Sequence, residues 1–296
     1  MNKIEKLQEI IDASDNIVFF GGAGVSTESG IPDFRSESGI FKSLEKYGDT
    51  PERLVSHSYY LEHTDKFFSY YKDCLIFPEA EPNPAHYTLA RLEKEGKLKA
   101  IITQNIDGLH QKAGSKNVLE LHGIVYRNYC EICKKEYDLN FILESEGIPH
   151  CTCGGIIKPD VVLYEEALDM NILNKSAQYI MSADTLIVGG TSLAVYPAAG
   201  LINYFKGKNL VLINKSKTDY DLLASLVINE AIGETLNKII FAYGGEEDVV
   251  SDAALILNKN DLQGFANVKT SDGKDYYEID IKGNTGTINK IPFVIN

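Results

Sequence analysis

The sequence lacks any apolar run long enough to cross a bilayer, since no stretch approaches the roughly 20 consecutive apolar residues that a membrane-spanning helix requires. Its first residues, MNKIEKLQEIIDAS, are amphipathic and charged, without the apolar core of a secretory signal peptide. These two absences predict a cytoplasmic protein with no membrane partner.

Positive charge is also scarce. Lysine and arginine number 29 against 42 acidic residues, which gives a formal net charge of -13. Because nucleic acid binding requires a basic face, this balance argues against a nucleic acid partner. An acidic protein suits a basic partner such as a lysine-containing protein segment, although a solvated acidic surface is the commoner reason for such a charge.

Cysteines are few, and four of the five stand in two close pairs. With five cysteines in 296 residues and no export signal, a disulfide framework is not expected. Cys130 and Cys133 form one pair, and Cys151 and Cys153 form the other at zinc-ribbon distance along the chain. Such pairs are typical of a structural zinc site, in which four thiolates surround one ion. Cys74 stands among aromatic residues and is predicted to be a small buried residue.

Short, continuous apolar runs separated by helical stretches indicate an α/β fold. Strands of this kind are typical of a parallel sheet that is covered by helices on both faces, in a Rossmann-like, doubly wound arrangement. The predicted strands are 16–20, 99–103, 185–189 and 209–214, and the clearest predicted helices are 86–95 and 170–182.

Three segments depart from this pattern. Residues about 36–80 are aromatic and are predicted to be a helical insertion, and residues about 125–158 contain the paired cysteines and are predicted to be a small zinc-binding module. The glycine-rich and acidic stretch 244–248 is typical of a linker. The chain is therefore divided into a main domain, 1–243, and a short α+β C-terminal extension, 244–296, which is too small to bury a core alone.

The extension contains a predicted helical or mixed segment at 253–262 and two predicted strands, 276–281 and 286–295, with a turn at Gly283-Asn284. It loosely resembles a fragment of the major capsid protein of tailed phages, through LILNKNDLQGFANVKTSDGK and GTINKIPFVIN. Three roles remain open for it: docking on the main domain, recruiting a partner, or none, as a remnant.

A glycine-rich turn follows the first predicted strand directly. Gly22 and Gly24 allow the backbone to approach a phosphate group and to present N–H groups to it. The G-x-G-x-x-G pattern of hydride-transfer enzymes is not met, because Thr27 stands at the position of the third glycine. Hydrogen-bonding side chains continue as far as Arg35, so the turn predicts a ligand site more strongly than an ordinary exposed loop.

Four motifs resemble those of the sirtuins, the NAD-dependent protein-lysine deacylases, and most closely the bacterial deacetylases of that family. They occur in the sirtuin order, and the resemblance covers about residues 1–240. It implies NAD as a co-substrate, a structural zinc ion, and an acetylated protein or peptide as the substrate. The motifs are GAGVSTESGIPDFR at 22–35, TQNIDGLH at 103–110, LHG at 121–123 and GTSL at 190–193.

The resemblance implies that His122 is the general base. An imidazole suits this role, because its usual pKa of about 6.5 lets it accept a proton near neutral pH. In the sirtuin reaction the acyl oxygen of the substrate lysine attacks the ribose carbon as nicotinamide leaves, and the histidine then activates a ribose hydroxyl. The products are deacetylated lysine and O-acetyl-ADP-ribose, and no hydride moves.

The resemblance also implies contacts along the whole NAD molecule. Asn105 and Asp107 would hold the carboxamide and its ribose side, and an amide suits a carboxamide because each offers a donor and an acceptor. Gln104 would contact the ribose hydroxyls, whereas His110 has no assigned role and is predicted to be a capping or core residue. The full set of implied NAD contacts is Gly22, Ala23, Gly24, Asp33, Phe34, Arg35, Gln104, Asn105, Asp107, Gly190, Ser192, Asn214 and Ile232.

The segment KPDVVLYEE, 158–166, would form one wall of the acyl-lysine tunnel, with the peptide pairing with it as an added strand. Phe34, Val162 and Tyr164 would face the alkyl chain. Many sirtuins have glycine where Glu165 stands, which changes the expected peptide contacts. The aromatic run FFSYYK lacks the Tyr-x-x-Arg pair that grips a succinyl carboxylate, so a neutral acyl group is expected.

Two functions of different classes fit these observations. The first is an NAD-dependent protein-lysine deacetylase, with an NAD-hydrolysing or ADP-ribosyl-transferring variant of the same pocket. The second is an NAD-binding module that its tail tethers to a viral or particle assembly. The complete motif set, including His122, favours the deacetylase.

Overall fold

The computed structural model describes residues 2–33, 36–239, 242–243, 263–270, 276–282, 285–288 and 291–294. Its main element is a six-stranded parallel sheet with the strand order β3-β2-β1-β7-β8-β9. The chain builds outward from β1 to β3 and then returns to the other side of β1, which confirms the predicted doubly wound fold. The strands are β1 (Ile17–Gly21), β2 (Leu98–Thr103), β3 (Val118–Glu120), β7 (Thr185–Gly189), β8 (Asn209–Ile213) and β9 (Leu226–Ile228).

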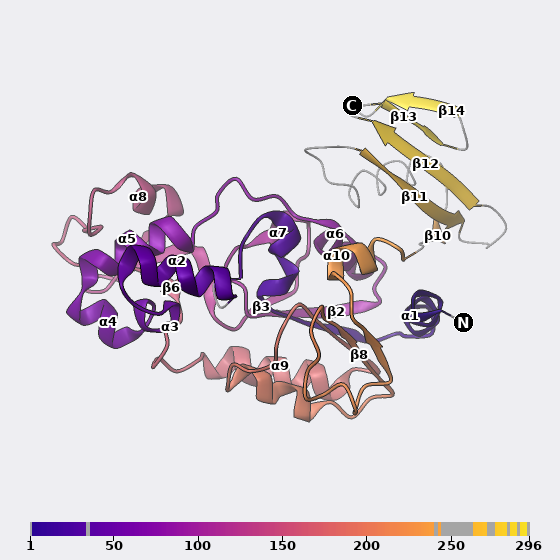
Figure 1. Cartoon of the computed structure of the whole chain (residues 1–296), viewed down its shortest axis with the longest axis horizontal. Coiled ribbons are helices and arrows are strands. Elements are labelled where there is room, and N and C mark those ends of the chain that lie inside the picture. The colour runs from indigo at the N-terminus through magenta and orange to yellow at the C-terminus, as the bar shows by residue number, and fades with distance from the viewer. Residues whose placement is uncertain are drawn as a thin grey trace.

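Both faces of this sheet are buried, as its continuous apolar strands require. Successive side chains of a strand point to opposite faces, so Ile17 and Phe19 of β1 join one core while Val18 and Phe20 join another. Helices α1, α6 and α10 cover the first face, and α9 and the 3-10 helix η3 cover the second (Figure 1). Their bounds are α1 (Lys3–Asp12), α6 (Pro84–Lys94), α9 (Met170–Ser182), η3 (Ala198–Tyr204) and α10 (Ile232–Leu236).

Helix α1 shows how the local sequence sets these elements. The side chain of Asn2 accepts a hydrogen bond from the Glu5 N–H at 2.8 Å, and the Glu5 carboxylate accepts one from the Asn2 N–H at 2.8 Å. This capping box satisfies two donors that the first turn would otherwise leave without partners. Leu7, Ile10 and Ile11 then form one buried stripe, which packs against the sheet.

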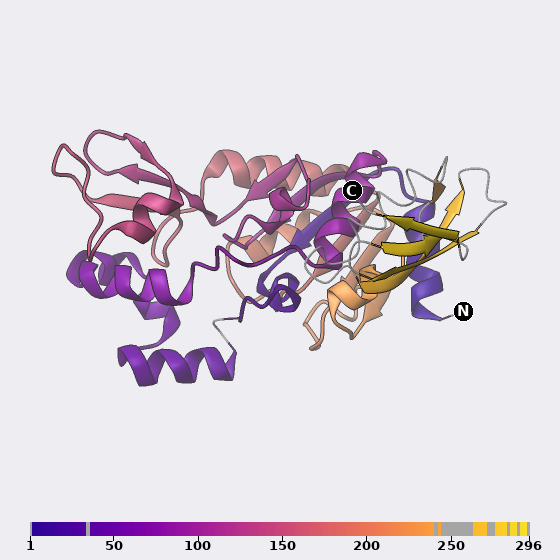
Figure 2. The same ribbon diagram turned by 90° about the horizontal axis from the view of Figure 1, so that it is seen from above.

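The two predicted insertions form a second lobe at the end of the molecule that lies away from α1 (Figures 1 and 2). The helical insertion contains α2 (Glu37–Tyr47), α3 (Pro51–Leu54), α4 (His57–Glu62) and α5 (Thr64–Cys74). The cysteine-containing module is a three-stranded antiparallel sheet in the order β5-β4-β6 with one short helix. Its elements are β4 (Gly123–Cys130), β5 (Glu136–Tyr137), α8 (Leu139–Glu144) and β6 (Ile157–Val161).

These two insertions share one hydrophobic core. Tyr60, Phe67 and Tyr71 of the helices belong to the same buried cluster as Ile142 and Ile157 of the cysteine module. The Tyr60 and Phe67 rings meet edge to face with centroids 5.0 Å apart, a favoured geometry for aromatic pairs. The aromatic run that marked the helical insertion in the sequence therefore also holds the cysteine module in place.

The C-terminal region forms a separate sheet with the order β10-β11-β12-β13-β14. Strand β12 confirms the predicted strand 276–281. The prediction of a single strand at 286–295 is wrong, because this region contains two strands, β13 and β14. The predicted segments 253–262 and 244–248 and the turn Gly283-Asn284 lie outside the described residues. The strands are β10 (Ala242–Tyr243), β11 (Gln263–Thr270), β12 (Tyr276–Lys282), β13 (Thr285–Ile288) and β14 (Ile291–Val294).

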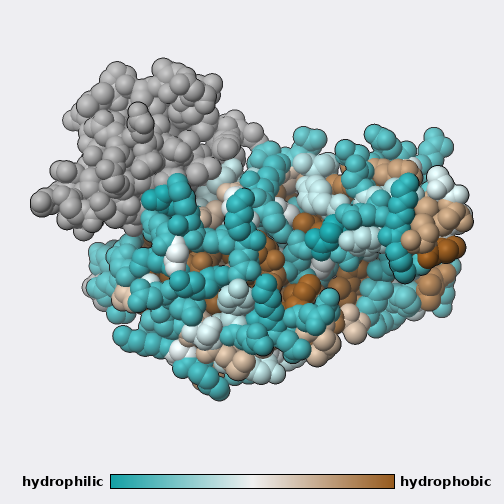
Figure 3. Space-filling model, turned by 180° about the vertical axis from the view of Figure 1, so that it is seen from behind, coloured by the Kyte–Doolittle hydropathy of each residue, from teal (hydrophilic) through white to brown (hydrophobic). Residues whose placement is uncertain are grey.

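Strand β10 pairs with β11 in parallel, although it precedes the expected domain boundary at residue 243. The division of the chain at this point stays a prediction. In the part of the chain that the structure describes, no helix has both the length and the apolar character needed to cross a bilayer. The face shown in Figure 3 is mostly hydrophilic, with hydrophobic side chains in small patches.

The packing of β4 on β6 leaves no space for a Cβ at Gly123. Gly123 has a φ of +76°, and a Cβ there would lie 1.9 Å from the Asp160 carbonyl oxygen. Gly96 has a φ of +74° but no heavy atom within 4 Å of the same position. Alanine is strained at both sites, but only Gly123→Ala must also separate two strands. We expect it to lower the free energy of unfolding by about 1–3 kcal/mol more than Gly96→Ala, measured by urea denaturation. Equal losses would contradict this close packing.

Candidate active site

A cleft lies along the carboxyl ends of the parallel strands, where an open α/β sheet usually binds its ligand. It contains about 1250 Å³ of empty space, counted out to its open mouth. One side is formed by segments that follow β1, β2, β3 and β7, and the other by residues of the second lobe and the segment after β6. The predicted site residues in its lining are Ala23, Gln104, Asn105, Asp107, His122, Val162 and Tyr164.

Two glycine turns meet at the base of this region. The Gly24 N–H donates to the Gly190 carbonyl oxygen at 2.8 Å. A Cβ on Gly24 would lie 2.7 Å from the Gly190 Cα, and a Cβ on Gly190 would lie 2.3 Å from the Val25 nitrogen. Gly22 has a similar restriction, since its Cβ would lie 2.8 Å from the Thr191 Cβ. These glycines are therefore required by the contact between the turns that follow β1 and β7, in addition to any phosphate that the turn binds.

Three polar side chains of the cleft form one hydrogen-bonded group. The Ser26 hydroxyl donates to the Asp107 carboxylate at 2.6 Å and accepts from the Asn105 amide at 3.0 Å. Burial raises the pKa of Asp107, although the hydrogen bonds from Ser26, the Leu109 N–H and Asn105 lower it. Ser26 is almost fully buried and lines the cleft, yet it was absent from the predicted contacts. A serine inside the glycine-rich motif was the available signal.

A second polar connection joins the ends of three strands. The Gln104 side-chain amide donates to the Thr191 hydroxyl at 3.1 Å, and the Thr191 N–H donates to the Asn214 side chain at 2.8 Å. Gln104 follows β2, Thr191 follows β7 and Asn214 follows β8. Thr191 was also missed, although it lies between the predicted contacts Gly190 and Ser192.

His122 lies between the sheet and the second lobe, directly before β4. Its Nδ1 is 3.0 Å from the carbonyl oxygen of Gln104. A carbonyl can only accept, so Nδ1 carries the hydrogen, and in the neutral ring Nε2 carries the lone pair. The structure thus brings an imidazole with a defined tautomer into the same cleft as Asn105 and Asp107.

The predicted substrate wall is fixed by backbone hydrogen bonds on both sides. The Val162 N–H donates to the His122 carbonyl at 3.0 Å, which connects the wall to the histidine. Tyr164 donates to the Val55 carbonyl at 3.0 Å and accepts from the His57 N–H at 2.9 Å, which connects it to the helical insertion. The half-buried side chains of Val162 and Tyr164 line the cleft.

Among the described residues, the predicted contacts Asp33, Ser192 and Ile232 lie outside this lining. Asp33 is half-buried, and Phe34 and Arg35 lie outside the described residues. Ser192 is exposed after β7. Ile232 is a core residue, and its side chain packs so closely on Gly189 that a Cβ there would lie 2.1 Å from it. Their contacts with NAD stay predictions.

Two residues outside the expected site can also be compared with their predictions. His110 is fully buried, as predicted for a core residue, and its ring centroid lies 4.8 Å from that of His86. Burial lowers the pKa of His110 to about 3, so the ring is neutral at physiological pH. The prediction that Cys74 is buried is wrong, because it is half-buried and lines the cleft.

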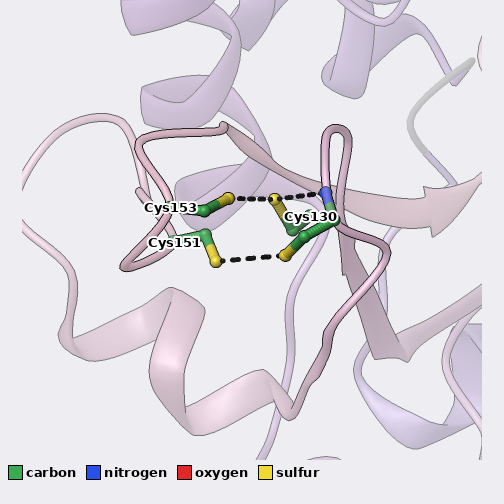
Figure 4. Close-up of side chains that lie close together, drawn as sticks. Cys130, Cys151 and Cys153 are labelled. Carbon is green, nitrogen blue, oxygen red and sulfur yellow. Dashed lines mark hydrogen bonds between the residues drawn. The ribbon is translucent and has the colours of Figure 1, made fainter.

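The four paired cysteines converge in the second lobe (Figure 4). Their sulfur atoms all lie within 4.8 Å of one another. The Sγ atoms of Cys130 and Cys153 are 3.4 Å apart, and those of Cys133 and Cys151 are 3.5 Å apart. Four thiolates around zinc, at roughly 2.3 Å each, would have sulfur–sulfur distances of roughly 3.8 Å. The cluster therefore fits a closed tetrahedral zinc site.

The surroundings of these thiols also favour a cation. Hydrogen bonds from the Cys153 N–H and the Tyr137 hydroxyl lower the pKa of Cys151 to about 5, and the Cys133 N–H lowers that of Cys130. Although the Gly155 N–H lowers it, the pKa of Cys153 rises to about 12 because the other three thiols hydrogen-bond to it. A divalent cation would allow all four to be thiolates at neutral pH.

Comparisons with known proteins agree with this geometry. A model of the Sir2 family matches residues 22–197. The NAD-dependent protein deacetylase of Clostridium perfringens is 65% identical over 241 residues, which cover 81% of this chain and 99% of that protein. The chain belongs to the Sir2 family. An NAD-dependent protein deacetylase of Cutibacterium acnes, which is 50% identical over 235 residues, covers 79% of this chain and 96% of its own length.

Solved Sir2 structures share this fold. One described as "Sir2-p53 peptide-NAD+" has 38% sequence identity and a TM-score of 0.71, over 79% of this chain and 96% of that chain. Another, "Sir2 bound to acetylated peptide", has 37% identity and a TM-score of 0.70 over the same shares of the two chains. The part of this chain left uncovered corresponds in size to the C-terminal extension.

The zinc site of this Sir2 chain gives a prediction about Tyr137. Its hydroxyl donates to the Cys151 Sγ at 3.0 Å, so it would hydrogen-bond to one of the thiolates that would hold the zinc ion. Groups that hydrogen-bond to metal ligands typically contribute 10- to 100-fold to metal affinity. We expect one zinc per chain in the native protein, and about tenfold faster zinc loss to a chelating dye in Tyr137→Phe.

Tyr129→Phe, on β4, is the matched control. Tyr129 also belongs to the cysteine module, but no hydrogen bond joins its hydroxyl to a cysteine among the described residues. It should lose zinc at the native rate. Freshly purified native protein without zinc would contradict the site, and equal rates in the two variants would contradict the role of Tyr137.

Proposed function

We propose that this chain is an NAD-dependent protein-lysine deacetylase that transfers the acetyl group of acetyl-lysine to ADP-ribose and releases nicotinamide. The observation that carries this proposal is the position of His122. Its Nδ1 is held by the Gln104 carbonyl, which leaves the lone pair of the neutral ring on Nε2 for proton abstraction. The deacetylase names of relatives that are 65% and 50% identical to this chain support the same activity.

The polar side chains of the cleft suit the nicotinamide end of NAD. We assign Asn105 and Asp107 to the carboxamide and its ribose side, since amide and carboxylate groups supply the donors and acceptors that these groups require. Gln104 is assigned to the ribose hydroxyls. The turn Gly22–Gly24 is assigned to the pyrophosphate through the Ala23 N–H, because the Gly22 and Gly24 N–H groups donate to the Gly189 and Gly190 carbonyl oxygens. Gly190, Ser192, Asn214 and Ile232 are assigned to the adenosine half, with Asp33, Phe34 and Arg35 completing the set.

The expected acyl group is neutral and short. The described lining of the cleft contains no lysine or arginine that could pair with a distal carboxylate. Lys72, which ends the run FFSYYK, instead donates to the carbonyl oxygens of Ser145 and Gly147. Val162 and Tyr164, together with Phe34, are assigned to the alkyl chain of acetyl-lysine.

We also infer a cytoplasmic location. A four-cysteine zinc site needs its thiols reduced, and the cytoplasm keeps them in that state. The cysteine cluster, with all sulfur atoms within 4.8 Å of one another, supports this inference.

The function is tested with an acetyl-lysine peptide, NAD and mass spectrometry. The native protein should yield deacetylated peptide, nicotinamide and O-acetyl-ADP-ribose in equal amounts. His122→Ala should lower turnover by about 10²- to 10⁴-fold, the usual effect of removing a general base, while NAD binding measured by calorimetry is largely retained.

His63→Ala is the control, because His63 lies at the end of α4 and outside the cleft lining. It should turn over at the native rate. Nicotinamide release without acetyl-peptide would identify an NAD hydrolase instead, and NAD binding without any turnover would support a binding module. Near-native turnover by His122→Ala would remove this residue from the mechanism.

The domain division gives a further prediction. All proposed site residues lie between Gly22 and Ile232, so deletion of residues 245–296 should leave acetyl-peptide turnover unchanged at saturating NAD. The deletion also removes β11, the partner of β10, and this local loss should affect Ala242 and Tyr243 alone. Circular dichroism would verify the fold of the truncated protein. Loss of most turnover in a folded truncation would place the extension within the functional unit.

A further inference from the structure

Glu165 has an unusual conformation at the edge of the cleft. Its φ is +77°, in the left-handed region that residues with a Cβ seldom adopt. Glycine takes this conformation without strain, so a glutamate here is retained against a conformational cost. The residue is exposed and belongs to the cleft lining, directly after Tyr164 of the proposed substrate wall.

The carboxylate of Glu165 is held in one place. It accepts a hydrogen bond from the Ser58 N–H at 2.8 Å and another from the Ser58 hydroxyl at 3.0 Å. Most exposed glutamates are mobile, and their charge is spread over many positions. Here two neutral donors from the first turn of α4 fix the position of the carboxylate without neutralising it.

The adjacent acid differs in its surroundings. Glu166 forms an ion pair with Lys158 at 3.3 Å, is hydrogen-bonded to the His57 Nδ1 at 2.9 Å, and accepts from the Leu163 N–H at 2.8 Å. Among the described residues, Glu165 has no such pair with a lysine, arginine or histidine. Glu166 is thus a structural acid, whereas Glu165 is an exposed acid of the cleft lining with no ion-pair partner among the described residues.

We propose that Glu165 is a specificity-determining residue that favours peptides with a lysine or arginine within two positions of the acetyl-lysine. This inference rests on the proposed deacetylase function and specifies its substrate class. An extended peptide advances about 3.3 Å per residue, so side chains one or two positions from an acetyl-lysine beside Tyr164 lie close to residue 165. One or two such steps along the peptide are shorter than the length of about 8 Å over which physiological salt screens a charge.

The test uses acetyl-lysine peptides that differ only at one flanking position, which is lysine, glutamine or glutamate, on either side in turn. For the native holoenzyme we expect kcat/KM to fall in that order, by about three- to tenfold from lysine to glutamate at low salt and by less at high salt. In Glu165→Gln this ratio should approach one. Glu165→Gly, which removes the charge and also relieves the backbone, should lose the preference equally.

Glu62→Gln is the charge-matched control. Glu62 is exposed at the end of α4 and lies outside the cleft lining, so this variant should keep the native preference. Turnover without a charge preference in the native protein, or a preference that survives in Glu165→Gln, would overturn the inference alone. Absence of turnover with every peptide would overturn the proposed function and this inference together.

Discussion

Gln104 is the point at which the sheet, His122 and the proposed substrate wall are connected. Its N–H donates to the Gly21 carbonyl at the end of β1, and its own carbonyl accepts from His122. The carbonyl of His122 then accepts from the Val162 N–H. Apart from the imidazole, every group in this series belongs to the main chain, so the position of the histidine is set by the pairing of β1 with β2. A reacting group held in this way loses little precision to side-chain rotation.

The second lobe extends this dependence to the zinc site. The helical insertion and the cysteine module share one core, and β6 leads from that core directly into the wall that contains Val162 and Tyr164. Cys130 and Cys151 are themselves members of the core. A zinc ion bound by the four cysteines would therefore stabilise one side of the cleft without contacting the substrate, because metal binding contributes free energy to the fold of its module.

The sequence was most informative where a single segment carries the whole signal. The strand 185–189 and the helix 170–182 were predicted with their observed bounds, because continuous apolar runs and helical periodicity are local properties. The convergence of the four cysteines was predicted from their spacing alone. Ser26 and Thr191 were missed because their partners, Asn105 and Gln104, stand 79 and 87 residues away. Ser58, which anchors Glu165, stands 107 residues away from it. Cys74 was misjudged because its aromatic neighbours do not show which side of α5 faces the cleft.

The scarcity of positive charge connects these separate features of the site. The described lining has no lysine or arginine, and the turn Gly22–Gly24 that is proposed for the NAD phosphates is held in place by the close contact of Gly24 with Gly190. The proposal of a neutral acyl group rests on the same lack of cations in the described lining. Burial raises the pKa of Asp107, and the positive nicotinamide ring of NAD would oppose that shift by stabilising the carboxylate. The exposed charge of Glu165 would likewise favour a basic peptide. The scarcity of positive charge at the site would thus favour the cationic nicotinamide ring, the neutral acyl group and the basic substrate together.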